Sequence, residues 1–122
     1  MMKVKMLLFI LAISISNIAV CQSSKVKLTE KQKIEALIKS VEELENAKFY
    51  RNGSLYDAKT AAKHLRMKLN NAGNRVKTTI DFIDKIASKS SMSGNSYKIV
   101  FADGHEVKTR DYFLKRLREL EQ

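Results

Sequence analysis

The single cysteine of this 122-residue chain, Cys21, is the feature that most limits what the chain can fold into. Because there is no second cysteine to pair with, the part that folds can contain no internal disulfide. We therefore expect a fold held together by its apolar core alone. A chain of this length predicts at most one domain.

Cys21 also ends an N-terminal segment with the pattern of a secretory signal. Lysines near the start precede the apolar block "MLLFILAISISNI", and small or polar residues follow it. The serines and asparagine in this block come too early for a membrane-spanning helix, which needs roughly 20 apolar residues. The pattern predicts a signal peptide over residues 1–21, a linker over 22–28 and a single domain over 29–122. We expect no transmembrane helix in the mature chain.

Two ways of processing this segment stay open at Cys21. Cleavage after Cys21 would place Ala19 and Cys21 at the small-residue positions and leave Gln22 as the new N-terminus. Alternatively, "IAVC" resembles the bacterial lipoprotein box, although Val20 stands where that box has a small residue, and lipid would then be attached to Cys21. Both outcomes predict an exported protein, periplasmic or secreted.

The charge of the chain is strongly basic and unevenly spread. The net charge is +10, and residues 48–77 hold eight basic residues and one acid, Asp57. In an exported protein this balance suits an anionic envelope polymer, although a solvated basic surface is the alternative. We expect no nucleic-acid partner, because neither an aromatic-rich strand nor a zinc pattern accompanies the charge.

Two helices are predicted on either side of a turn. The first begins with the capping box of Thr29 and Gln32. Its apolar stripe, at helical spacing, consists of Ile34, Leu37, Ile38, Val41 and Leu44. The second is capped by Asp57 and ends at Gly73. Its apolar face, rich in alanines that allow close helix packing, consists of Ala58, Ala61, Ala62, Leu65, Leu69 and Ala72.

Two further helices are predicted from their caps. Thr78 and Asp81 form a reciprocal capping pattern at the start of the third. Its inward-facing residues are expected to be Ile80, Phe82, Ile83, Ile86 and Ala87. Thr109 is expected to cap the fourth, whose apolar side consists of Tyr112, Phe113, Leu117 and Leu120.

Two β-hairpins complete the predicted fold. The Asn52-Gly53 pair accepts positive φ at both turn positions and would pair Phe49 with Tyr56 and Arg51 with Ser54. The stretch "YKIVFADGHEVK" predicts a second hairpin with a three-residue loop that ends at Gly104. The fold class is therefore α+β, with about four helices and two short β-hairpins.

Three stretches of the chain resemble a known family. "FYRNGSLYDAKTAAKHLRMKL", "AGNRVKTTIDFI" and "ASKSSMSGNSYKIVFADG" are similar, in order and spacing, to the YfeK-like family of small exported bacterial proteins, a domain of unknown function. The resemblance runs from about Phe49 to Leu120. It implies a location in the bacterial envelope and an α+β plan, and it implies no activity. The family usually has lysine and proline where this chain has Asn95 and Ser96, so this loop is expected to be less rigid.

The serine-rich loop of this resemblance, residues 88–96, has three interpretations. It is a connector, an anion-binding nest of amides and hydroxyls, or the loop of a nucleophilic serine. A nucleophile needs a base, for which His64, His105, Lys85 and Lys89 are available, but the G-x-S-x-G and S-x-x-K patterns are absent.

We expect polar residues of these motifs to converge on one cleft that holds an anionic group, from an envelope polymer or a protein partner's C-terminus. The cleft would have no chemistry of its own. Its expected residues are Arg51, Asn52, His64, Arg66, Arg75, Lys77, Thr78, Ser90, Ser91 and Ser93. A serine-loop hydrolase and a purely structural envelope protein are the alternatives. No cofactor or metal is expected, because the histidines lack ligand spacing and no phosphate-binding glycine motif occurs.

Overall fold

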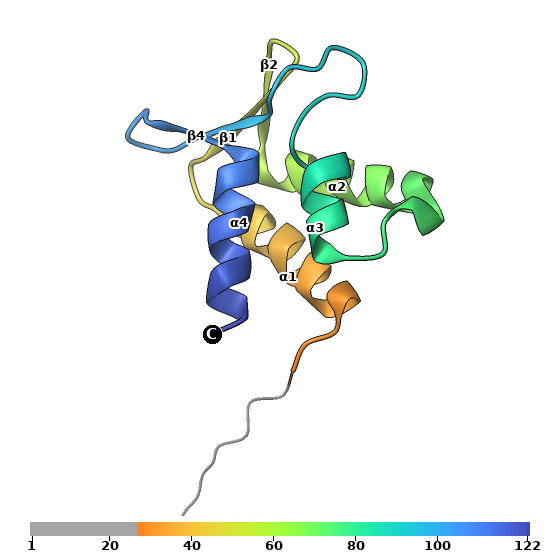
Figure 1. The fold of residues 1–122 in the computed structure, drawn as a ribbon. Helices are drawn as coiled ribbons and strands as arrows, with labels where there is room; N and C mark the ends of the chain where they lie inside the picture. The colour runs from red at the N-terminus through yellow and green to blue at the C-terminus, as the bar shows by residue number, and fades with distance from the viewer. Residues whose placement is uncertain (1–26) are drawn as a thin grey trace, which may run out of the picture.

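The computed structural model describes residues 27–122 (Figure 1). The predicted signal peptide, Cys21 and most of the predicted linker lie outside these residues. Within them the chain forms four α-helices and one four-stranded antiparallel sheet, which confirms the α+β prediction. No helix between residues 27 and 122 is both long and apolar enough to cross a bilayer.

The sheet contains both predicted hairpins. Its strands are β1 (Lys48–Arg51), β2 (Ser54–Asp57), β3 (Lys98–Val100) and β4 (Glu106–Lys108), in the order β2-β1-β3-β4. The predicted pairs of Phe49 with Tyr56 and Arg51 with Ser54 are confirmed, and Asn52 and Gly53 have φ values of 51° and 84°. Antiparallel pairing of β1 with β3 joins the hairpins into one sheet, which the sequence analysis did not predict.

The helices begin where their caps predict, with one exception. They are α1 (Glu30–Glu42), α2 (Ala58–Ala72), α3 (Thr79–Asp81) and α4 (Thr109–Leu120). The capping boxes of Thr29 and Thr78 and the Asp57 cap are all formed. A 3₁₀ turn, η1 (Gly73–Arg75), follows α2, and a π-helical turn, η2 (Phe82–Ile86), continues α3.

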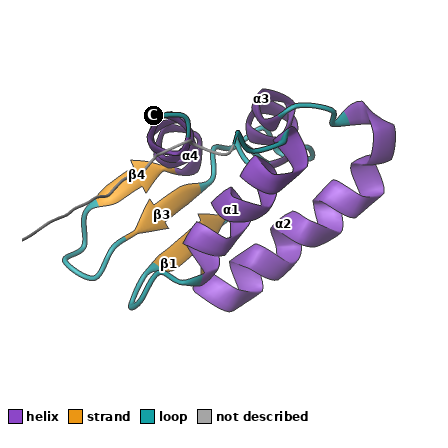
Figure 2. Cartoon of the chain, turned by 90° about the horizontal axis from the view of Figure 1, so that it is seen from below, coloured by secondary structure: helices purple, strands orange, loops and turns teal. Residues whose placement is uncertain are grey.

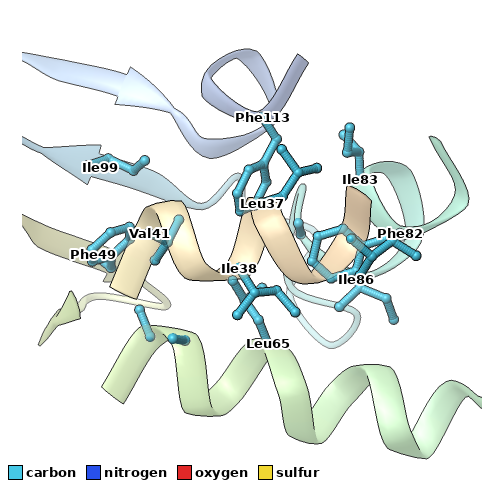
Figure 3. Close-up of a cluster of buried hydrophobic side chains, with 14 of the residues drawn as sticks. Leu37, Ile38, Val41, Phe49, Leu65, Phe82, Ile83, Ile86, Ile99 and Phe113 are labelled. Carbon is cyan, nitrogen blue, oxygen red and sulfur yellow. The ribbon is translucent and has the colours of Figure 1, made fainter. Parts of the chain in front are cut away.

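The helices cover one face of the sheet, and α1 lies at the centre of the core (Figures 1 and 2). In Figure 3, Leu37 points toward Phe113 of α4, and Ile38 points toward Leu65 of α2. Leu37 and Phe113 are fully buried, as is Ile99 of β3. Because α1 contacts α2, α3 and α4, its apolar stripe is the surface on which the other helices assemble.

One predicted core residue is wrong. Ile80 is 46% exposed, and Thr79 takes the inward position instead. The N–H and hydroxyl of Thr79 both donate to Glu30, which fixes the start of α3 against α1. A turn of 100° per residue then carries Ile80 toward solvent. The other inward-facing residues predicted for this helix are confirmed, namely Phe82, Ile83, Ile86 and Ala87.

The prediction that Thr109 caps α4 is also wrong. Lys108 holds the N-cap position, without a side-chain capping bond, and Thr109 is the first helical residue. Thr109 is 4% exposed, and its N–H donates to the Tyr97 carbonyl over 2.9 Å. This bond extends the β3–β4 pairing by one residue, and Oγ1 of Thr109 has no hydrogen-bond partner among the described residues.

Candidate functional site

A pocket lies where the β1–β2 hairpin meets α2, and we call it the hairpin pocket. About 40 Å³ of it is open to water-sized atoms, and its wall is mostly apolar. Its lining residues are Phe49, Tyr50, Arg51, Tyr56, Ala61, His64, Leu65, Lys68, Tyr97 and Thr109. None of them is acidic, whereas arginine, lysine and histidine are all represented.

Arg51 and His64, both predicted site residues, meet in this pocket. The Arg51 guanidinium lies 3.3 Å from His64 Nδ1. Arginine is always a donor, so Nδ1 must accept and the neutral imidazole carries its proton on Nε2. Partial burial, with the charges of Arg51 and Lys63, holds the pKa of His64 below its ordinary 6.5. The ring is also fixed by an edge-on contact with Tyr56, with centroids 5.1 Å apart.

Lys68 and Tyr97 complete the pocket, and neither was predicted from the sequence as a site residue. Lys68 Nζ donates to the Tyr97 hydroxyl over 2.8 Å and to the Ile86 carbonyl over 2.9 Å. Lys68 follows His64 by four residues on α2, so both belong to one helix face. That spacing was a usable signal for Lys68, but Tyr97 reaches the site only through the pairing of β1 with β3.

Two residues of the hairpin pocket's lining each have a buried polar side-chain atom without a hydrogen-bond partner among the described residues. These atoms are Nε of Arg51 and Oγ1 of Thr109. Leaving a buried donor unpaired costs about 1–3 kcal/mol, so such atoms call for a partner. The structure has a third such atom in residues 27–122, Nε of Arg116 on α4, but the lining of the hairpin pocket is where two of them occur together.

Asn52, Ser90 and Ser93 lie together beside the pocket and bind one another. Asn52 Nδ2 donates to Ser90 Oγ over 3.2 Å, and Ser93 Oγ donates to Asn52 Oδ1 over 2.7 Å. Ser90 Oγ also accepts the N–H groups of Met92 and Ser93. The serine loop is therefore fastened to the tip of the first hairpin. No hydrogen bond in residues 27–122 joins Ser90, Ser91 or Ser93 to a histidine or lysine.

Arg75 and Ser91 line a second pocket at the C-terminal end of α2, which we call the α2-end pocket. It has about 360 Å³ open to water-sized atoms. Its lining residues are Lys68, Asn71, Ala72, Arg75, Val76, Lys85, Ile86 and Ser91. Lys68 belongs to the lining of both pockets.

The remaining predicted site residues lie elsewhere. Arg66 bonds Glu35 and Glu42 of α1, at 3.0 Å and 3.3 Å, and lines a groove between α1 and α2 together with Lys77. Thr78 caps α3. The prediction of one common cleft is therefore wrong, because the acids of α1 hold Arg66 on another side of α2. Whether the individual residues bind a ligand stays a prediction.

No cluster of three or more histidine, cysteine or acidic side chains with the spacing of a metal site occurs in residues 27–122.

Comparisons with known proteins relate this chain to proteins of unknown function. Residues 28–121 match the Family of unknown function (DUF5329). The chain is 38% identical to the "Uncharacterized protein YfeK" of Salmonella typhimurium over 74 residues, which are 61% of this chain and 62% of that protein. The match thus spans about three fifths of the relative's length. No solved structure matches the chain.

Proposed function

Because the chain belongs to the Family of unknown function (DUF5329), its function has to be argued from its own site, and we propose that the protein binds the carboxylate of an envelope component in the hairpin pocket, without chemical reaction. The observation that carries this proposal is the pair of unpartnered buried polar atoms, Arg51 Nε and Thr109 Oγ1, in a pocket without acidic residues. A carboxylate that reached both atoms would accept from both.

The pocket has room for a carboxylate group. A buried water needs about 10–15 Å³ by this measure, so 40 Å³ holds about three water-sized groups, which is the number of heavy atoms in a carboxylate. The apolar wall suits the first carbons that carry such a group.

The expected source of the carboxylate is the bacterial envelope, either a polymer or the C-terminus of a protein partner. Residues 1–21 have the signal pattern that would export the chain, with cleavage or lipidation at Cys21. Loss of Lys3 and Lys5 with the signal lowers the net charge from +10 to +8, which would still draw the protein toward anionic envelope material. Binding without reaction is favoured because the Ser90 hydroxyl already accepts from two amides and Asn52 and has no base beside it.

The test is a titration of the purified protein with propionate, followed by ¹H–¹⁵N NMR. We expect saturable shifts of the Arg51 Nε–H, Thr109 and Tyr97 signals, with a dissociation constant near the millimolar range that suits so small a ligand. Arg51→Gln should abolish these shifts, because it removes the guanidinium that pairs with the carboxylate.

Lys59→Gln is the matched control, since it removes one positive charge from α2 outside the pocket lining. Its shifts should equal those of the unmodified protein, and well-dispersed spectra would show that both variants are folded. Equal losses in the two variants, or shifts that never saturate, would contradict the proposal and point to diffuse charge attraction.

A further inference from the structure

The two pockets follow one face of α2 and share Lys68. Residues 61, 64, 65 and 68 line the hairpin pocket, and residues 68, 71 and 72 line the α2-end pocket. These positions recur at intervals of three and four residues, so they form one continuous stripe along the helix. The two groups are about six residues apart on average, which is about 9 Å along the helix axis.

The α2-end pocket also has cations and no acid in its lining, namely Lys68, Arg75 and Lys85. Arg75 donates from Nε to the Ala72 carbonyl over 3.2 Å and from Nη2 to the Asn71 carbonyl over 3.4 Å. These bonds use only part of its five N–H donors and do not neutralise its charge.

Lys85 has less hydrogen-bonding capacity left for a ligand than Arg75. Its Nζ donates to the Arg75 carbonyl over 3.0 Å and lies 3.8 Å from Asp81. Arg75 is therefore the cation of this pocket with the most capacity left for an anion, and the exposed hydroxyl of Ser91 lies in the same lining.

We propose that the α2-end pocket is a second anion subsite, so that the ligand is a chain with two anionic groups about 9 Å apart. This inference rests on the proposed function, because the first of the two groups is the carboxylate in the hairpin pocket. The second group meets Arg75 and Ser91. The larger space there, about 360 Å³, accepts a second carboxylate or a bulkier anion.

The test compares α,ω-dicarboxylates with monocarboxylates of the same carbon number, on the purified protein by ¹H–¹⁵N NMR. The probes are succinate, adipate, suberate and sebacate, against butanoate, hexanoate, octanoate and decanoate. We expect affinity to peak at suberate, whose carboxylates are separated by about this distance when the chain is extended. Suberate should bind about three- to fivefold more tightly than octanoate, which is the gain expected from one added surface ion pair. Its second carboxylate should shift the Arg75 Nε–H signal.

Arg75→Gln should remove this advantage and leave octanoate binding unchanged, and Arg75→Lys should restore part of it. Lys77→Gln, which removes one charge two residues away and outside this pocket, should keep the advantage. If suberate binds no more tightly than octanoate while octanoate still shifts the hairpin pocket, the second subsite is refuted and the proposed function stands. If neither compound shifts the hairpin pocket, both proposals fail.

Discussion

At the scale of single residues, His64 connects the pocket to pH. Burial and the neighbouring charges of Arg51 and Lys63 hold the pKa of His64 below 6.5, so the ring is neutral at pH 7. Its Nδ1 accepts from Arg51 only in this neutral form. Protonation of His64 would therefore break that bond and place a second cation beside the guanidinium.

A bound carboxylate should raise the pKa of His64, because a negative charge nearby stabilises the protonated ring. By linkage, propionate should bind more tightly as the pH falls through this pKa. Titration of the His64 ring protons by NMR, with and without saturating propionate, measures the shift. In Arg51→Gln the midpoint should not respond to propionate. An unchanged midpoint in the unmodified protein would argue against a carboxylate next to His64.

Without ligand, the same lowered pKa makes the fold less stable in acid. The unfolded chain takes up this proton near pH 6.5, and the folded chain does so only at lower pH. The contribution of His64 to stability therefore falls as the pH drops from 6.5 toward the folded pKa.

At the scale of elements, local signals predicted most of the helix starts and both hairpin registers. Thr29, Asp57 and Thr78 cap helices because the side chain of each accepts the amide three residues further on, a spacing that can be found in the sequence. Thr109 was misjudged because its environment depends on Tyr97, a distant neighbour through β3. The β1–β3 pairing was missed for the same reason.

The same difference between local signals and contacts of distant residues applies to the candidate site. Arg51 and His64 were both predicted as site residues, and they meet because a two-residue hairpin leads directly into α2. Tyr97 is 29 residues from its partner Lys68, so only the folded sheet brings it to the pocket. Arg66 was placed wrongly because its acidic partners come from α1, which the sequence motifs did not link to it.

The hydrogen bonds that join the first hairpin to the serine loop lead to a prediction about stability. Asn52→Gly keeps a residue suited to the positive φ of 51° but removes the bonds to Ser90 and Ser93. We expect a loss of about 1–2 kcal/mol in the free energy of unfolding, measured by urea denaturation. In a protein that already carries Ser93→Ala, one of these bonds is absent, so Asn52→Gly should lower the free energy of unfolding by less. Strictly additive losses in the double variant would mean that the two side chains are not coupled.

At the scale of the whole molecule, no disulfide supports the fold, because the chain has one cysteine and it lies at position 21. Stability comes from the core around α1 and from ion pairs and hydrogen bonds between the ends of neighbouring helices. Nζ of Lys33, on α1, lies 2.8 Å from a carboxylate oxygen of Glu121 and 3.2 Å from one of Glu30. The other carboxylate oxygen of Glu30 accepts the Thr79 N–H over 2.7 Å. These contacts join α1, α3 and the end of α4.

The proposed export predicts a specific mass for the protein recovered from a bacterial envelope. Cleavage after Cys21 leaves residues 22–122, and lipidation leaves residues 21–122 with acyl groups on Cys21. Intact-protein mass spectrometry separates the two, and Cys21→Ser should abolish only the lipidated form. Recovery of the full 122-residue mass from the cytosol would refute export.

The central place of α1 also determines when the protein can fold. The apolar stripe of α1 is covered by α2 and α3, but this cover is completed only by α4, and the Lys33–Glu121 bond spans 88 residues. A chain that emerges residue by residue, from a ribosome or through a membrane pore, therefore cannot complete its core before α4 has emerged.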